Sequence, residues 1–178
     1  MSTEASRANR MKKLVQVRLF LLVLLLLFLG ATARLGWWAV NATATPPAWE
    51  NKLGQSVLQA SLARQARGLT NPLQLTNEVL IAGMKVFKVN CAGCHGEPGR
   101  PSQWGTQGFY SRVPQFFELS PPLSAPQMFV AIKHGIRYSG MGAWSGLMPD
   151  QDIWRVATFL EHIGSLPPEV QANWRAVQ

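Results

Sequence analysis

The sequence predicts an all-α protein in which an N-terminal transmembrane helix and a short linker helix precede one small helical domain. Three observations support this fold class. An unbroken apolar segment occupies residues 19–33. Pro and Gly, which favour turns and loops, are frequent in the long passage between residues 96 and 126. Apolar side chains recur with helical spacing in the stretches 49–67, 76–90, 128–135 and 149–164.

The 178 residues are enough for one domain and an appendage. We therefore expect five segments in chain order. They are a basic cytoplasmic N-terminus at residues 1–18, a transmembrane anchor or signal segment at 19–40, a linker with an amphipathic helix at 41–75, the main domain at 76–168, and a C-terminal tail at 169–178.

The N-terminus combines positive charge with a leucine-rich core. Its first forty residues contain six Lys or Arg residues against the single acidic residue Glu4. Two interpretations remain open. Ala31-Thr32-Ala33 fits the cleavage site of a signal peptide, whereas residues 19–40, at about 1.5 Å per residue, would cross the hydrocarbon core of a bilayer. Trp37 and Trp38 suit a membrane interface and favour the uncleaved anchor.

Either interpretation leaves the basic flank in the cytoplasm. We expect a single-pass protein of a bacterial inner membrane with its main domain in the periplasm, or a soluble periplasmic protein if the segment is cleaved. Most of the net charge of +8 lies in the N-terminal region. We therefore predict membrane lipid as a partner of this segment and no nucleic acid as a partner of the protein.

The two cysteines of the chain, Cys91 and Cys94, form a C-x-x-C-H motif with His95. This motif is the attachment signature of c-type haem, because each thiol can form a thioether with a haem vinyl group while the histidine binds the iron. It predicts one covalent haem c. A zinc site would need two further ligands, and His134 and His162 lie far apart in the sequence. A thioredoxin-like dithiol would need a βαβ pattern that the chain lacks.

Two further patterns resemble the class I c-type cytochromes, in particular their membrane-anchored or exported monohaem members. Gly83, Phe87 and Cys91 lie four residues apart, as in the first helix of that family. The run from Gly140 to Trp144 resembles its methionine loop. The resemblance covers residues 76–168 and implies a cytochrome c-like haem domain. It also implies that Val156 and Phe159 in the last helix meet the first helix.

The resemblance further implies that His95 and Met141 are the two axial ligands of the iron. Met148 and His134 are rival ligands to Met141. Gly142 stands where the family usually has a proline, so the loop lacks one fixed φ angle and would hold the iron–sulfur bond less rigidly.

By family analogy, a proline carbonyl should accept a hydrogen bond from His95 and orient its ring. Pro98, Pro101 and Pro114 are the candidates. The side chains expected to pack on the haem or to contact its propionates are Phe87, Val113, Trp144, Tyr138 and Arg137.

An iron with both axial positions filled exchanges electrons but does not readily bind a substrate. The sequence therefore predicts an electron carrier and not an enzyme, with redox proteins in or at the membrane as partners: a respiratory complex, a dehydrogenase or an oxidase. Two alternatives stay open. In the first, the chain is the haem subunit of a membrane dehydrogenase or terminal oxidase. In the second, it is a ligand-binding haem protein with a labile bond between the iron and Met141.

Overall fold

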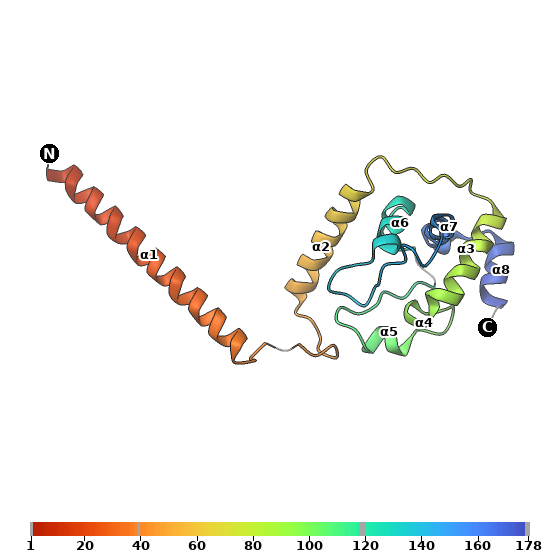
Figure 1. The fold of residues 1–178 in the computed structure, drawn as a ribbon, viewed down its shortest axis with the longest axis horizontal. Coiled ribbons are helices and arrows are strands. Elements are labelled where there is room, and N and C mark those ends of the chain that lie inside the picture. The colour runs from red at the N-terminus through yellow and green to blue at the C-terminus, as the bar shows by residue number, and fades with distance from the viewer. Residues whose placement is uncertain (1, 39, 118–119, 177–178) are drawn as a thin grey trace. The chain divides into compact units, whose positions relative to one another are not determined.

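The structure is a computed structural model that describes residues 2–38, 40–117 and 120–176. Residue 39 of the predicted anchor and residues 177–178 of the predicted tail lie outside these ranges. The chain divides into two compact units, residues 1–40 and 41–178, which are described separately. Within the described ranges, all the regular secondary-structure elements are helices (Figure 1). The all-α prediction is confirmed.

The first unit consists of the helix α1, Ser2–Arg34, and the turn that follows it. Its segment Asn9–Arg34 has a mean hydropathy of 2.5 and is long and apolar enough to cross a membrane. The leucine-rich part of this helix is exposed on all sides. A helix that is apolar all round suits a lipid environment.

Helix α1 ends at Arg34, so the predicted segment 19–40 is helical only in its first part. Gly36 has a φ of +72°, and the backbone N–H of Trp37 donates to the carbonyl oxygen of Thr32 at 3.1 Å. A left-handed glycine with this bonding is a common helix stop. Trp37 and Trp38 therefore follow the helix and do not belong to it.

The core of the second unit is built on the packing of α3, Asn77–Asn90, against α7, Asp150–His162. The hydroxyl of Thr76 caps α3 by accepting a hydrogen bond from the backbone N–H of Val79 at 3.3 Å. Apolar side chains of both helices are almost fully buried at the contact, which removes them from water and stabilises the pair.

Gly83 is the point of closest approach between α3 and α7. A Cβ atom on this residue would lie 2.9 Å from the Cβ atom of Phe159 and closer still to the backbone of Arg155. The aromatic rings of Phe87 and Phe159 pack one turn further on, with centroids 5.9 Å apart. This is the helix contact that the family resemblance implied.

Helix α6, Ala125–His134, adds a further face to the core. Its N-terminus carries a capping box made by Ser124 and Gln127. The ring of Phe129 stacks on that of Trp154 in α7, with centroids 4.1 Å apart.

Helix α2, Ala48–Gln65, lies beside α6 (Figure 1). Leu62 is buried and Leu58 is half-buried against the core. Leu53 and Val57 are exposed on another face of the same helix. The predicted linker helix is therefore present, but its apolar residues lie on two faces and not on one.

The Pro/Gly-rich passage after His95 contains a short helix that the sequence pattern did not predict. Helix α5, Gln103–Gln107, begins where the hydroxyl of Ser102 accepts a hydrogen bond from the backbone N–H of Gly105 at 2.9 Å. A Cβ atom at Gly105 would collide with the carbonyl oxygen of Cys94. Five residues are too few to show a helical period, which is why the pattern missed this element.

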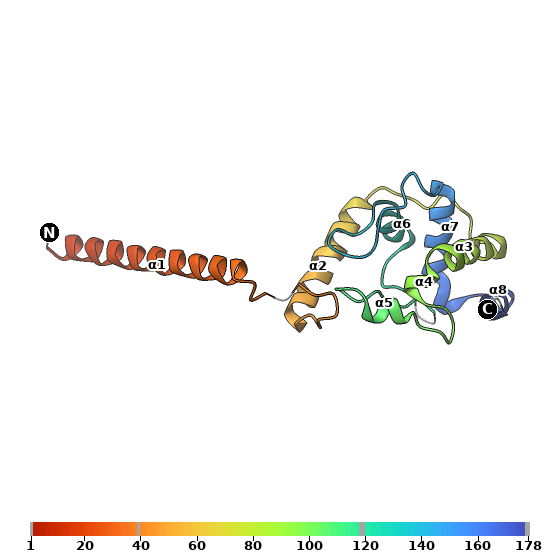
Figure 2. The same ribbon diagram turned by 60° about the horizontal axis from the view of Figure 1, so that its bottom comes forward.

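The segment predicted as a C-terminal tail contains a packed helix, and that prediction is corrected. After the 3-10 turn η1, Ile163–Ser165, helix α8, Pro168–Ala176, lies beside α3 (Figures 1 and 2). Val170 and Trp174 are buried. Trp174 packs edge-on against the rings of Phe87 and Phe159. Two apolar residues in a polar stretch do not reveal this helix by their spacing.

Candidate functional site

The cysteine turn links the end of α3 to the four-residue helix α4, Ala92–His95. The carbonyl oxygen of Cys91 accepts hydrogen bonds from the backbone N–H groups of Cys94, at 3.1 Å, and His95, at 2.9 Å. This single turn holds both thiols and the imidazole together. Both thiols are free and half-buried.

Cys91 does not have the lowered pKa of a reactive cysteine. Burial, and to a smaller extent the nearby Cys94, raises the pKa of Cys91 to about 12. A reactive cysteine needs a lowered pKa, because the thiolate is the nucleophile. The raised pKa therefore argues against a redox-active dithiol at this turn.

The ring of His95 is oriented by Pro114. Nδ1 of His95 lies 2.8 Å from the carbonyl oxygen of Pro114, and since a carbonyl only accepts, Nδ1 carries the proton. Nε2 is left with its lone pair, the form in which imidazole binds metals. Burial lowers the pKa of His95, against the opposing effect of the Pro114 carbonyl, and so favours the neutral ring. Of the three candidate prolines, the structure selects Pro114.

The ring of His95 also stacks on Phe116, with centroids 4.7 Å apart and an angle of 9° between the planes. The backbone N–H of Phe116 donates to the carbonyl oxygen of His95 at 2.8 Å. The segment that follows Pro114 is thus held against the cysteine turn by both the backbone and the side chain of Phe116.

Gln115 connects this segment to the turn, and sequence reasoning missed it. Its Nε2 donates to the carbonyl oxygens of Cys94 and Val113, both at 3.0 Å. Its Oε1 accepts from the backbone N–H of Ser102 at 2.8 Å. No sequence motif marks a glutamine that acts through backbone groups of distant segments. The residue fixes the carbonyl of Pro114 indirectly, by fixing its neighbours.

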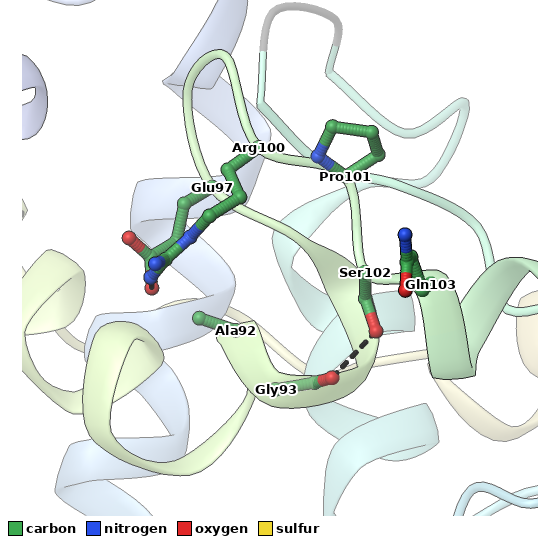
Figure 3. Close-up of a pocket in the computed structure, with 7 residues that line it drawn as sticks. All are labelled: Ala92, Gly93, Glu97, Arg100, Pro101, Ser102 and Gln103. Atoms are coloured by element: carbon green, nitrogen blue, oxygen red, sulfur yellow. Dashed lines mark hydrogen bonds and ion pairs between the residues drawn. The ribbon is translucent and has the colours of Figure 1, made fainter.

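A shallow groove of about 470 Å³ lies beside the turn, lined by residues of α4 and of the following loop (Figure 3). Figure 3 shows the hydroxyl of Ser102 directed at the carbonyl oxygen of Gly93, which it reaches at 2.6 Å. The charged groups that line the groove, Glu97 and Arg100, pair with each other at 3.4 Å. Neither thiol lines this groove, so we assign it no role in the chemistry.

The loop of Met141 follows α6 and is held by backbone bonds. The carbonyl oxygen of Met141 accepts a hydrogen bond from the backbone N–H of Ile136 at 2.9 Å. The backbone N–H of Trp144 donates to the carbonyl oxygen of Ile132 at 3.2 Å. Gly140 lies directly against the ring of Phe109. Met141 is half-buried and packs on the core. Trp144 and the rival ligand Met148 are also half-buried and also pack on the core.

The remaining predicted residues occupy two kinds of position. The ring of Phe87 is fully buried and lies 6.4 Å from that of His95. Val113 is half-buried, and its backbone N–H donates a hydrogen bond to the carbonyl oxygen of Gly105 at 3.0 Å. Arg137 and Tyr138 are exposed, and Tyr138, 93% exposed, has a φ of 59°.

The two other histidines lie outside this arrangement. His134 ends α6 and is exposed. Nδ1 of His162 lies 2.9 Å from the carbonyl oxygen of Thr158, one turn earlier in its own helix. Among the residues that the structure describes, no cluster of three or more His, Cys, Asp or Glu side chains could hold a metal ion.

The donor set therefore fits an iron porphyrin and not a bare ion. Two thiols are available for thioethers, one imidazole nitrogen is available for iron, and aromatic side chains lie around the imidazole. Comparison with known proteins points the same way. Residues 79–160 match the family model described as "Cytochrome C oxidase, cbb3-type, subunit III". No curated protein matches the chain.

Proposed function

We propose that the protein, whose residues 79–160 match a c-type cytochrome family model, transfers single electrons through its covalent haem, with His95 and Met141 as the axial ligands. When bound, the haem supplies an iron that alternates between Fe(III) and Fe(II). The observation that carries the proposal is the 2.8 Å contact between His95 and Pro114, because it leaves Nε2 as the free metal-binding atom on the C-x-x-C-H turn.

Each residue then has a distinct task. Cys91 and Cys94 attach the cofactor, and the hydrogen bond to Pro114 raises the basicity of His95. A methionine thioether is a soft and weak donor that favours Fe(II) and raises the reduction potential. Phe87 and Phe116 exclude water from the imidazole, which further controls the potential.

Helix α1 would keep this domain at a membrane. The basic flank that includes Arg10, Lys12 and Lys13 stays in the cytoplasm under the positive-inside rule. The domain at residues 76–168 then lies on the periplasmic side, joined to the anchor by the linker at 41–75. Confinement to the membrane raises the effective concentration of the carrier near membrane-bound partners.

A second function is favoured by the name of the matching family. Subunit III of a cbb3-type oxidase is part of an enzyme complex, so the chain would deliver electrons to a catalytic centre on another polypeptide. Purification from gently solubilised membranes separates the two functions. A fixed stoichiometry with an oxidase or dehydrogenase supports the subunit, and a protein that purifies alone supports the mobile carrier.

The axial ligand is tested by absorption spectroscopy. A methionine–iron bond gives a weak far-red charge-transfer band in the oxidised protein. Met141→Ala should abolish this band, while Met148→Ala should leave it intact. The reverse result would transfer the ligand role to Met148. Rapid carbon monoxide binding by the unmodified reduced protein would favour a ligand-binding haem protein.

The anchor is tested separately by washing membranes with high salt and then with alkaline carbonate. A protein held by α1 stays in the pellet. Release into the wash, with an N-terminus that begins after Ala33, would identify a cleaved signal peptide instead.

A further inference from the structure

Helix α2 carries an apolar face that no part of the described chain covers. Trp49, Leu53 and Val57 are 68%, 58% and 61% exposed. They recur every four residues, so they lie on one side of the helix. Leu58 and Leu62, on the opposite side, already pack on the core. The exposed face is therefore not needed to hold α2 on the domain.

The charge around this face is positive. Arg64 lies seven residues after Val57 and so on the same side of the helix, and Lys52 lies near the border of this face. Arg67 follows the end of the helix at Gln65. The one acidic residue of the helix, Glu50, accepts a hydrogen bond from the hydroxyl of Tyr110 at 2.8 Å. An apolar stripe with a tryptophan at one end and cationic residues at its edge is typical of helices that lie in a membrane interface.

Arg112 binds the segment that precedes α2 and so limits the length of free chain after α1. Its guanidinium donates to the carbonyl oxygens of Ala42, Thr43 and Ala44 at 2.9 to 3.3 Å. It also donates to Gln107 and Phe109 at 3.0 and 2.8 Å. The linker is thereby fixed to the second unit from residue 42 onward. Between the end of α1 and this point the chain can extend by only about 25 Å.

A protein partner fits this face less well than lipid. A stable protein interface buries roughly 800 Å² on each side and involves about 20 residues. Three apolar side chains in one narrow stripe are far fewer. Lipid requires no minimum area, because the anchor already holds the helix near the bilayer.

We propose that α2 is an interfacial helix whose Trp49, Leu53 and Val57 face inserts between the headgroups of an anionic membrane. This inference rests on the proposed membrane anchor. The contact fixes the orientation of the haem domain at the membrane surface, so that the domain does not sweep freely around its tether. Anionic headgroups are bound by Lys52, Arg64 and Arg67.

Spin labelling of the full-length haem protein in lipid nanodiscs tests this contact. The label is placed at Leu53→Cys, where it is the sole free thiol once both native cysteines carry the haem. In nanodiscs containing phosphatidylglycerol, relaxation of the label by oxygen should rise several-fold relative to relaxation by a water-soluble nickel chelate. The control is Val89→Cys on α3, where the side chain is 84% exposed, and there the nickel chelate should dominate.

A label at residue 53 with the water accessibility of residue 89 would overturn the proposal. So would a label shielded from both reagents, because that result means that protein covers the face. Arg64→Glu should reduce the lipid signal at residue 53, whereas Lys85→Glu on α3 should not. Retention of the haem protein in the nanodiscs is scored independently. Loss of retention contradicts the anchor, and retention with an aqueous label contradicts only the role of α2.

Discussion

Gly83 in α3 lies against the backbone carbonyl of Arg155 in α7, with no space for a side chain between the two helices. The position of α3 relative to α7 depends on this contact. The C-x-x-C-H turn begins where α3 ends, so the same contact also fixes where both thiols and the imidazole lie relative to α7.

Gly83→Ala should therefore destabilise the domain by about 1–3 kcal/mol, the usual cost of overpacking a close helix contact. The measurement is denaturant unfolding followed by haem absorption. Gly54→Ala in α2 is the control, because a Cβ atom there meets no neighbour. It should be neutral or stabilise the protein by up to about 1 kcal/mol. If both substitutions changed the free energy of unfolding equally, the close contact between α3 and α7 at Gly83 would not have this role.

Gln115→Leu should lower stability by about 2 kcal/mol and raise the reduction potential. The change removes hydrogen bonds to Cys94, Val113 and Ser102, each worth roughly 1 kcal/mol or less. A less firmly held Pro114 carbonyl makes His95 a weaker donor, which disfavours Fe(III). Redox titration measures the second effect. Gln103→Leu, at an exposed position, should leave the potential unchanged, and an unchanged potential in both variants would refute the indirect role of Gln115.

If Met141 binds the iron as proposed, Gly140→Ala should weaken that bond, because its new methyl group would collide with the ring of Phe109. We expect a weaker far-red band in the oxidised protein and faster carbon monoxide binding in the reduced protein. Gly142→Ala, on the other side of the methionine, meets open space and should change neither. If Gly142→Ala has the larger effect, backbone freedom after the methionine controls the bond, and packing before it does not.

Arg112→Gln should release the linker from the domain, since a glutamine side chain cannot make the five contacts of the guanidinium. Limited proteolysis of the membrane-bound protein should then cut within residues 41–47 several-fold faster. Arg100→Gln is a matched control, because that side chain is 76% exposed and has only a 3.4 Å ion pair. Equal cleavage of both variants would exclude a clamp.

The pH dependence of stability should include a contribution from Glu78 at the start of α3. Hydrogen bonds from its own backbone N–H and from Thr76 lower the pKa of this carboxyl below its ordinary value of 4.5. The stabilisation is therefore fully present above pH 4.5 and is lost as the pH falls through the lower folded-state pKa. The difference in stability between the natural protein and Glu78→Gln should vanish in acid. A difference that persists unchanged would contradict this assignment.

Sequence patterns predicted the elements that depend on local signals. Thr76 caps α3 as expected, and α6 and α7 lie within a few residues of the stretches with helical spacing. Gly83 and Phe87 were singled out through a family resemblance, and both meet α7. The turn at Cys91 to His95 follows from one short motif.

The rest depends on contacts between distant segments, for which a single sequence has no signal. Gln115 acts on a carbonyl 21 residues earlier, and Arg112 acts on carbonyls 68 to 70 residues earlier. The selection of Pro114 over Pro98 and Pro101 required the folded loop. Trp174 packs on α3 although its own helix is short and largely polar.

The position of Trp174 gives the domain an order of assembly. Its ring closes the cluster of Phe87 and Phe159, and its carbonyl oxygen accepts a hydrogen bond from Lys88 at 3.0 Å. Trp174 follows Cys91 by more than eighty residues. If the N-terminus stays in the cytoplasm, as proposed, the segments after α1 cross the membrane in chain order, and both thiols emerge while this side of the core is still open. Haem attachment could then precede the completion of the fold, and α8 would close the domain over a cofactor that is already in place.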